Sequence, residues 1–169
     1  MSEINLKDIE FESYLLDNVR LFDEVLSEVG EPPLFENQNF EAHSSFAPFS
    51  HYLVMETTNK MKNTLPITIW FEGRDLVIDV DGIRESLEWA KKHIEADRNS
   101  VINYIRNLFT GYILVESRGY SRFVQIFDSD GDFAHAFSYN NLFHIITRLY
   151  LWRHKNYRRL YLPMFSKSK

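Results

Sequence analysis

The chain has 169 residues, of which 44% are hydrophobic, and a formal net charge of −5. A chain of this length can bury a sufficient core as a single domain, residues 1–169, without covalent support. It contains no cysteine, which excludes disulfides, thiol nucleophiles and cysteine-bound metals and fits a reducing cytoplasm. No basic leader with an apolar run begins the sequence, and no apolar stretch reaches about 20 residues. We therefore expect a cytoplasmic protein without a membrane span.

Charge is distributed unevenly along the chain. Residues 1–41 carry 11 acidic and 2 basic side chains, whereas residues 148–169 carry 7 basic side chains and no acidic one. Such asymmetry indicates either that the two ends meet or that one end meets a charged partner. We expect the basic tail to lie near acidic groups of the first helix.

The first helix is predicted over residues 5–29. Its apolar positions are spaced by three and four residues, as one face of a helix requires. These positions are Leu15, Val19, Phe22, Leu26 and Val29. Four acidic side chains lie off this stripe, and they are Asp17, Asp23, Glu24 and Glu28. We interpret these acids either as a solvated face or as a docking surface for a basic partner. Gly30 and the prolines after it are typical of a helix end.

A loop and a first antiparallel meander are expected next. Residues 31–50 combine prolines, polar residues and isolated phenylalanines, which is typical of a loop held to the core at intervals. Three β-rich runs follow, over residues 51–57, 65–71 and 76–80, and turn-forming residues separate them.

A long helical region follows this meander. Asp81-Gly82 is expected to begin a helix, because Glu85 stands where a capping arrangement needs an acid. Residues 97–100 (Asp-Arg-Asn-Ser) offer a break and a new cap. The pattern therefore predicts two consecutive helices or one kinked helix, ending near Gly111.

The strongest local signal lies between Gly111 and Tyr139. Three runs rich in Tyr, Ile, Val and Phe are joined there by two short turns, at residues 117–119 and 129–131, each ending in glycine. This pattern predicts a three-stranded antiparallel meander.

Together these elements predict an α+β fold, with antiparallel meander sheets and helices packed against one face. A last helix is expected to begin at Asn140 or Asn141, followed by a basic, aromatic tail over residues 153–169. Three strands and a helix then occur twice, which suggests an internal duplication, although the two halves share a pattern and no residues.

The second turn of this meander contains several acids. Asp128, Asp130 and Asp132 could supply oxygen ligands to calcium. An EF-hand loop, however, has its glycine after the third acid and a glutamate at position 12, whereas Gly131 precedes the third acid here and Tyr139 occupies position 12. The sequence favours a hairpin tip that binds no metal.

Histidines provide the only candidate catalytic cluster. His135 and His144 are nine residues apart, across a predicted strand-to-helix corner, and Glu116 lies on a neighbouring strand. These three side chains could act as a general acid–base cluster. His135 alternates with phenylalanines on one strand face, however, so a half-buried histidine is the simpler interpretation.

The tail mixes cations with aromatic rings, a combination that can grip phosphates and stack on bases. The residues of interest are Trp152, Arg153, Tyr157, Arg158 and Arg159. Three interpretations compete: pairing with the acidic helix, a surface for a protein partner, and nucleic-acid binding. The overall acidity argues against a dedicated nucleic-acid binder.

The sequence contains no phosphate-binding glycine loop and no Gly-x-Ser-x-Gly motif, and we expect no cofactor. By elimination, we predict a non-enzymatic protein-binding module, for example a bacterial inhibitor or immunity protein that neutralises a basic, nuclease-like toxin domain. Its acids would steer association with such a partner. The alternatives are a small enzyme that uses the histidine and glutamate cluster, and a nucleic-acid-binding protein that uses the tail.

Overall fold

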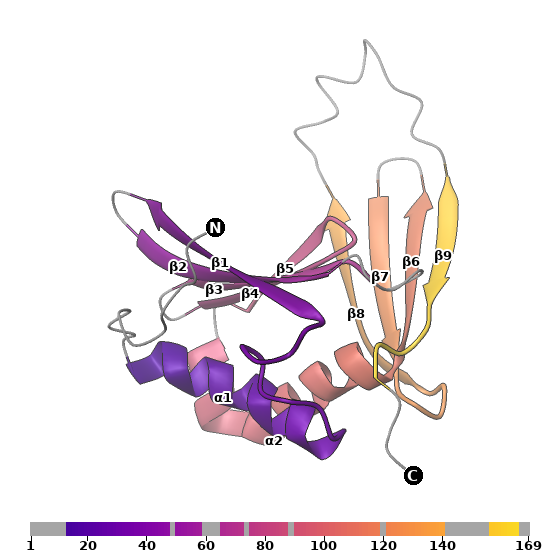
Figure 1. Ribbon diagram of the computed structural model, residues 1–169. Helices are drawn as coiled ribbons and strands as arrows, with labels where there is room; N and C mark the ends of the chain where they lie inside the picture. The colour runs from indigo at the N-terminus through magenta and orange to yellow at the C-terminus, as the bar shows by residue number, and fades with distance from the viewer. Residues whose placement is uncertain are drawn as a thin grey trace.

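The computed structural model describes residues 13–47, 50–58, 65–72, 75–87, 90–118, 121–140 and 156–165. Within these ranges the protein is an α+β fold, as predicted. Two helices lie together beneath one antiparallel sheet, and a second antiparallel sheet stands beside the first (Figure 1). The helices are α1 (Ser13–Glu28) and α2 (Ala90–Thr110).

Sheet A is a five-stranded meander whose strands follow one another in chain order. Its strands are β1 (Phe40–Ala47), β2 (Ser50–Thr57), β3 (Ile67–Glu72), β4 (Asp75–Val80) and β5 (Ile83–Leu87). The three strands predicted for this region correspond to β2, β3 and β4. Alternate residues of β3 and β4 are fully buried and face each other in register, as Ile69 and Ile78 do. This alternation buries one face of the sheet against the helices.

Strand β1 corrects the prediction of a loop over residues 31–50. Its sequence, Phe-Glu-Ala-His-Ser-Ser-Phe-Ala, lacks a run of β-branched residues. The strand nevertheless pairs with β2 along its whole length, from Phe40 opposite Thr57 to Ala47 opposite Ser50. Pairing to an adjacent strand, and not local propensity, therefore determines this element.

The expectation of a helix beginning at Asp81-Gly82 is wrong, because these residues form the two-residue turn between β4 and β5. Asp81 has φ of 52° and Gly82 has φ of 79°. Positive φ at both central residues is typical of a type I′ hairpin turn and is incompatible with a helix start. Asp79 Oδ1 accepts a hydrogen bond from the Gly82 N–H at 2.6 Å. Asp79 therefore lies near the end of β4, and Asp81 lies in the hairpin turn that follows.

The predicted break within the second helical region is confirmed at Asp97. This residue has φ of −152° and ψ of 73°, outside the helical range. Its carboxylate accepts a hydrogen bond from the Ser100 N–H at 3.1 Å, so Asp97 caps the second half of α2.

Sheet B has four strands in the order β8-β7-β6-β9. The strands are β6 (Tyr112–Arg118), β7 (Ser121–Phe127), β8 (Phe133–Asn140) and β9 (Tyr157–Tyr161). Strands β6 to β8 are the predicted meander. Part of the basic tail forms β9, which pairs antiparallel with β6 at the edge of the sheet. The predicted last helix lies outside the described residues, apart from Asn140, which belongs to β8.

The predicted hairpin at residues 129–131 is confirmed. Gly131 has φ of +91°, and Asp128 Oδ1 accepts backbone hydrogen bonds from Asp130 and Asp132 at 2.9 Å each. Across the described residues, no three acidic or histidine side chains are grouped as ligands of a metal ion. Sheets A and B differ in strand number and in connection, so an internal duplication is not shown.

The core between the helices and sheets is rich in phenylalanine. Phe22 of α1 packs edge-on against Phe71 of β3, with ring centroids 5.5 Å apart. Phe109 of α2 contacts Phe22, Phe40 and Phe165, and its ring centroid lies 5.6 to 5.9 Å from theirs. These rings join α1, α2, sheet A and the segment after β9 into one core.

Candidate binding surface

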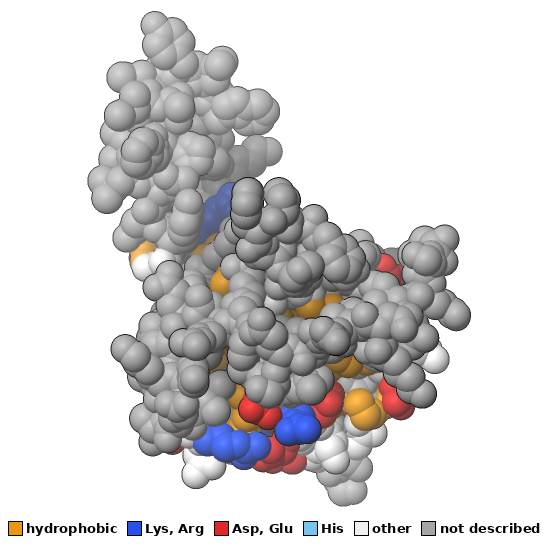
Figure 2. Space-filling model, turned by 90° about the vertical axis from the view of Figure 1, so that its left-hand side faces the viewer, with side chains coloured by type: hydrophobic (Ala, Val, Ile, Leu, Met, Phe, Trp, Pro, Cys, Tyr) orange, Lys and Arg blue, Asp and Glu red, His pale blue; other side chains and the backbone are white. Residues whose placement is uncertain are grey.

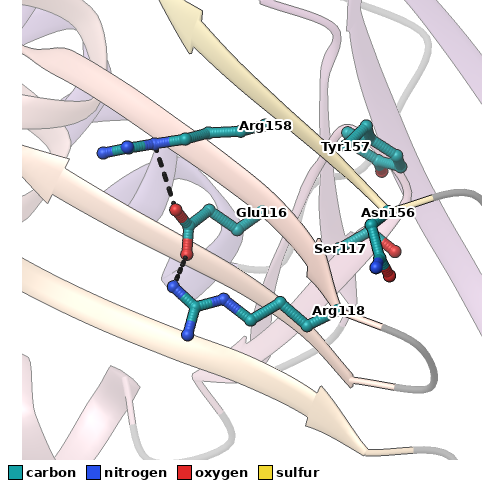
Figure 3. Close-up of a pocket in the computed structure, with 6 residues that line it drawn as sticks. All are labelled: Glu116, Ser117, Arg118, Asn156, Tyr157 and Arg158. Carbon is teal, nitrogen blue, oxygen red and sulfur yellow. Dashed lines mark hydrogen bonds and ion pairs between the residues drawn. The ribbon is translucent and has the colours of Figure 1, made fainter.

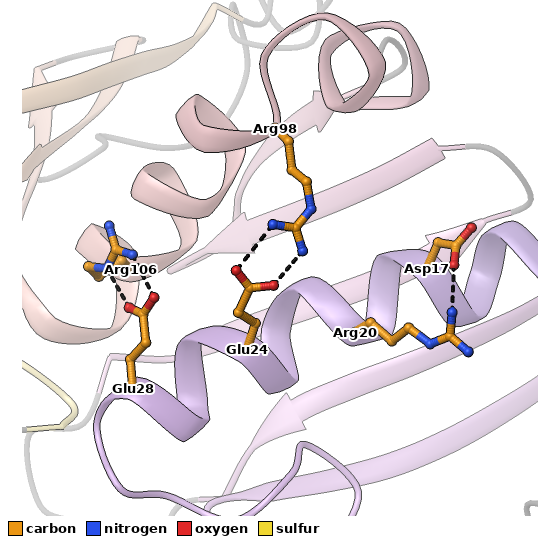
Figure 4. Close-up of polar contacts among 6 residues, drawn as sticks. All are labelled: Asp17, Arg20, Glu24, Glu28, Arg98 and Arg106. Atoms are coloured by element: carbon orange, nitrogen blue, oxygen red, sulfur yellow. Dashed lines mark hydrogen bonds and ion pairs between the residues drawn. The ribbon is translucent and has the colours of Figure 1, made fainter.

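Two acids of α1 are paired with arginines of α2. Glu24 accepts hydrogen bonds from both terminal nitrogens of Arg98, and Glu28 accepts them from Arg106 Nε at 2.7 Å and Nη2 at 2.8 Å (Figure 4). The hydrogen bonds from Arg98 hold the pKa of Glu24 below its ordinary value. Basic and acidic side chains accordingly lie side by side along the lower edge of the molecule (Figure 2). This part of the acidic face is already neutralised within the fold.

The other two predicted acids of α1 have different surroundings. Asp23 Oδ1 accepts a hydrogen bond from the Leu34 N–H at 2.7 Å and so holds the segment that follows the helix. Asp17 pairs with Arg20 on the same helix at 3.1 Å, where both side chains are exposed. Such an exposed pair contributes little to stability. Of the four acids, only Asp17 stands clear of other elements within the described part of the chain.

In the described part of the basic tail, residues 156–165, the arginines pair with acids of the sheets and of the turn between β4 and β5. Arg158 Nε lies 3.0 Å from Glu116 Oε1, and Arg159 Nη1 lies 3.9 Å from Asp81 Oδ2. Among the described residues, the expected pairing with the first helix is therefore not seen for these two arginines. Trp152 and Arg153 lie outside the described residues.

Glu116 is held between two arginines. Arg118 approaches one carboxylate oxygen at 2.7 Å, and Arg158 approaches the other at 3.0 Å (Figure 3). Both arginine side chains are more than 70% exposed, so most of their donors remain open to solvent. Together with Asn156 and Tyr157 they line a shallow hollow of about 420 Å³. The site carries two cations and one anion.

The predicted catalytic cluster is not assembled by the sheet. His135 is opposite Ile126, which is opposite Ile113, whereas Glu116 is three residues further along β6. Successive side chains of a strand point to opposite faces, so an odd separation puts His135 and Glu116 on opposite faces of sheet B. The His135 ring packs edge-on against Tyr104, at 5.0 Å between centroids. His144 lies outside the described residues.

A polar junction joins the two sheets on the inner face of sheet B. The turn between β4 and β5 brings Asp81 beside Arg159 and Tyr161 of β9. Asp81 Oδ2 is buried and has no hydrogen-bond partner among the described residues. Burial raises the pKa of Tyr161, the Asp81 carboxylate adds to the rise, and Arg159 opposes it. Arg159 also stacks on the Tyr157 ring, with its guanidinium carbon 4.9 Å from the centroid.

The outer face of sheet B, the face turned away from this junction, exposes large apolar side chains. Phe133, Leu160 and Leu162 are 62%, 61% and 62% exposed. Phe133 contacts Phe127 at 6.2 Å between ring centroids, and Phe127 is opposite Tyr112 of β6. On the far side of β6, Leu160 is opposite Leu114. Leu114 itself is only 6% exposed, so the set that we call the apolar patch consists of Tyr112, Phe127, Phe133, Leu160 and Leu162.

The apolar patch is not among the sites predicted from the sequence. In the tail, Leu160 and Leu162 alternate with Arg159 and Tyr161 at a period of two. That alternation was the available signal for a strand with one apolar face. The residue opposite Leu160 is Leu114, which lies more than 40 residues earlier in the chain, so the patch itself could not be seen in the sequence.

No protein-family model, curated protein or solved structure matches this chain. Neither described helix has the length and apolar character needed to cross a membrane.

Proposed function

We propose that this protein acts by binding another protein through the outer face of sheet B. The observation that carries the proposal is the apolar patch, in which Phe133, Leu160 and Leu162 each remain more than 60% exposed. Burial of apolar surface contributes about 25 cal/mol per Å². Contiguous exposed apolar residues with a polar rim are typical of interaction sites. Here the rim is the group formed by Glu116, Arg118 and Arg158.

An inhibitor that neutralises a toxin domain would need such a surface and no catalytic group. We place the contact on sheet B and not on α1, because arginines of α2 already neutralise Glu24 and Glu28. Those two acids would contribute little to steering a basic partner. Exposed charge steers association over distances up to the Debye length, but an internal pair has almost no net field at that range.

Affinity purification from the native host tests the proposal with three matched baits: the wild type, Leu160→Ser on the patch, and Asp17→Asn on the remote face of α1. We expect the wild type and Asp17→Asn to retain a stoichiometric protein. We expect Leu160→Ser to lose it through faster dissociation, because an exposed leucine at a contact centre mainly affects the off-rate. Circular dichroism and the melting temperature establish that each bait is folded.

Two results would contradict this function. The first is equal retention of the partner by the wild type and Leu160→Ser. The second is recovery of no macromolecule, combined with a turnover activity that His135→Ala abolishes without unfolding the protein. The enzyme interpretation would then replace the binding interpretation.

A further inference from the structure

Strand β9 is an edge strand with an ordered row of exposed side chains. It pairs with β6 on one side, and no described strand lies on its other side. Arg158 and Leu160 lie on its outer face and Leu162 directly follows its last residue, and the exposed fractions of all three are above 60%. Pro163 follows directly and lacks the N–H that a continued ladder would need. The edge along which no described strand pairs is therefore short and has a defined end.

The inner side of β9 is fixed in place. Arg159 and Tyr161 point to the junction with Asp81, and the Met164 and Phe165 N–H groups both donate to the Phe109 carbonyl, at 2.9 and 3.1 Å. A strand that is anchored on one face, with no described strand along its other edge, is preorganised to accept another strand.

Charge separates the two ends of the exposed row. At one end, Arg158 and Arg118 exceed the single charge of Glu116, which leaves one net positive charge. At the other end, Leu160 and Leu162 present only apolar surface, and the neighbouring outward residues Leu114 and Tyr112 are uncharged. A complementary strand would therefore carry an acidic residue at one end and apolar residues at the other.

We propose that β9 accepts an extended segment of a partner protein as an added antiparallel strand, with the pattern apolar–x–apolar–x–acidic. The two apolar side chains lie beside Leu162 and Leu160, and the acid lies beside Arg158. Backbone hydrogen bonds to the free edge supply affinity, and the alternate side chains supply specificity. We propose antiparallel addition because all the strand pairs in both sheets are antiparallel. This inference rests on the proposed function and specifies its partner.

Binding of three labelled peptides to the full-length protein, measured by fluorescence anisotropy, tests the proposal. The probe is Ser-Gly-Thr-Leu-Thr-Leu-Thr-Glu-Gly-Ser. One control peptide has lysine in place of glutamate, and the other has serine in place of both leucines. We expect the probe to bind about tenfold more tightly than either control, a difference of about 1.4 kcal/mol.

Protein variants locate the site. Arg158→Gln should abolish the preference for glutamate over lysine, and Arg158→Glu should reverse it. Leu160→Ser should weaken binding of the probe and of the lysine control about equally, because both of these peptides contain the two leucines. Arg20→Glu, which changes an exposed arginine on α1, should leave all three affinities unchanged. Arg158→Glu puts a second acid beside Glu116. If that variant fails to fold, the neutral variant Arg158→Gln still tests the preference for glutamate.

Four outcomes would each overturn the inference. The first is that the three peptides bind equally, and the second is that Leu160→Ser has no effect on binding. The remaining two concern what else covers the edge of β9. Sedimentation would show a wild-type dimer that Leu160→Ser converts to monomer, so that a second copy covers the edge. The outward amides of β9 would already resist hydrogen exchange in the free protein, so that the chain covers its own edge. If the peptides fail while Leu160→Ser still loses the copurified protein, the binding function stands and only strand addition is wrong.

Discussion

Gly111 and Gly131 restrict the chain for different physical reasons. A Cβ atom at Gly111 would lie 1.9 Å from the Phe127 carbonyl oxygen and 2.5 Å from that of Asn107, where α2 passes into sheet B. A Cβ atom at Gly131 would meet nothing within 4 Å, but the residue has φ of +91°. The first position therefore lacks space for a side chain, and the second has a backbone conformation that disfavours one.

We predict that Gly111→Ala destabilises the protein much more than Gly131→Ala. The first substitution forces backbone apart at a helix–sheet contact and should cost about 3 kcal/mol or more. The second should cost about 1 kcal/mol, because alanine tolerates the left-handed region poorly. Urea unfolding of both variants measures the difference. Equal losses, or a larger loss at Gly131, would show that the close approach at Gly111 is not maintained in solution.

Helices α1 and α2 are joined by charge as well as by their apolar faces. Val19, Phe22 and Leu26 of α1 are buried, and the two bidentate pairs from Glu24 and Glu28 bridge the adjacent surface. All four charged side chains remain partly exposed, so solvent screens the pairs and each contributes modestly. These pairs fix the register of one helix on the other more than they stabilise the fold.

The lowered pKa of Glu24 predicts a specific pH dependence. A carboxylate whose pKa is lower in the folded state contributes stability above its ordinary pKa, near 4.5, and loses it as the pH falls through the folded value. Glu24→Gln should therefore be less stable than the wild type at pH 7, and the difference should shrink to zero in stronger acid. Urea midpoints at a series of pH values measure it, with Asp17→Asn as an exposed control. A difference that does not change with pH would exclude the ion pair as its cause.

The junction of Asp81, Arg159 and Tyr161 connects the two sheets across the whole molecule. It brings together a turn that follows β4 and a strand that follows β8, almost 80 residues later. Arg122 of β7 also reaches this turn, since a Cβ atom at Gly82 would lie 3.6 Å from its Nη1 atom. Because β9 is held here, the same contact positions the exposed row of Arg158 and Leu160 on the opposite face.

We predict that the junction weakens at high pH. The pKa of Tyr161 is raised by burial, so its contribution is present below the ordinary tyrosine value near 10 and is lost as the pH rises through the folded value. As the pH rises from about 10 through the folded pKa of Tyr161, the Tyr161→Phe variant should therefore lose less stability than the wild type.

Asp81→Asn provides an independent measurement at the junction. Asparagine suits the same positive-φ turn, so the hairpin should persist while the negative charge is removed. The pKa of Tyr161, followed by absorbance against Tyr161→Phe, should then fall, because the Asp81 carboxylate contributes to its rise. An unchanged pKa would mean that Asp81 and Tyr161 are not close in solution.

Local sequence alone determined much of this fold. The stripe of α1, the cap at Asp97 and the hairpin at Gly131 each depend on residues within a few positions of one another, so spacing and turn chemistry were sufficient to predict them. The same holds for β2, β3 and β4 and for the meander of β6 to β8, whose alternation is strong and whose neighbours follow directly in the chain.

Only the tertiary structure decided the remaining elements. Asp81-Gly82 suits both a helix start and a hairpin, and the choice depends on the register of β5 against β4. Strand β1 exists because β2 lies beside it, and β9 exists because β6 does. The apolar patch combines residues from strands distant in the chain, and so does the ion pair of Glu116 with Arg158. Sequence patterns report local preference, whereas these features arise from pairing over long separations, which no local pattern encodes.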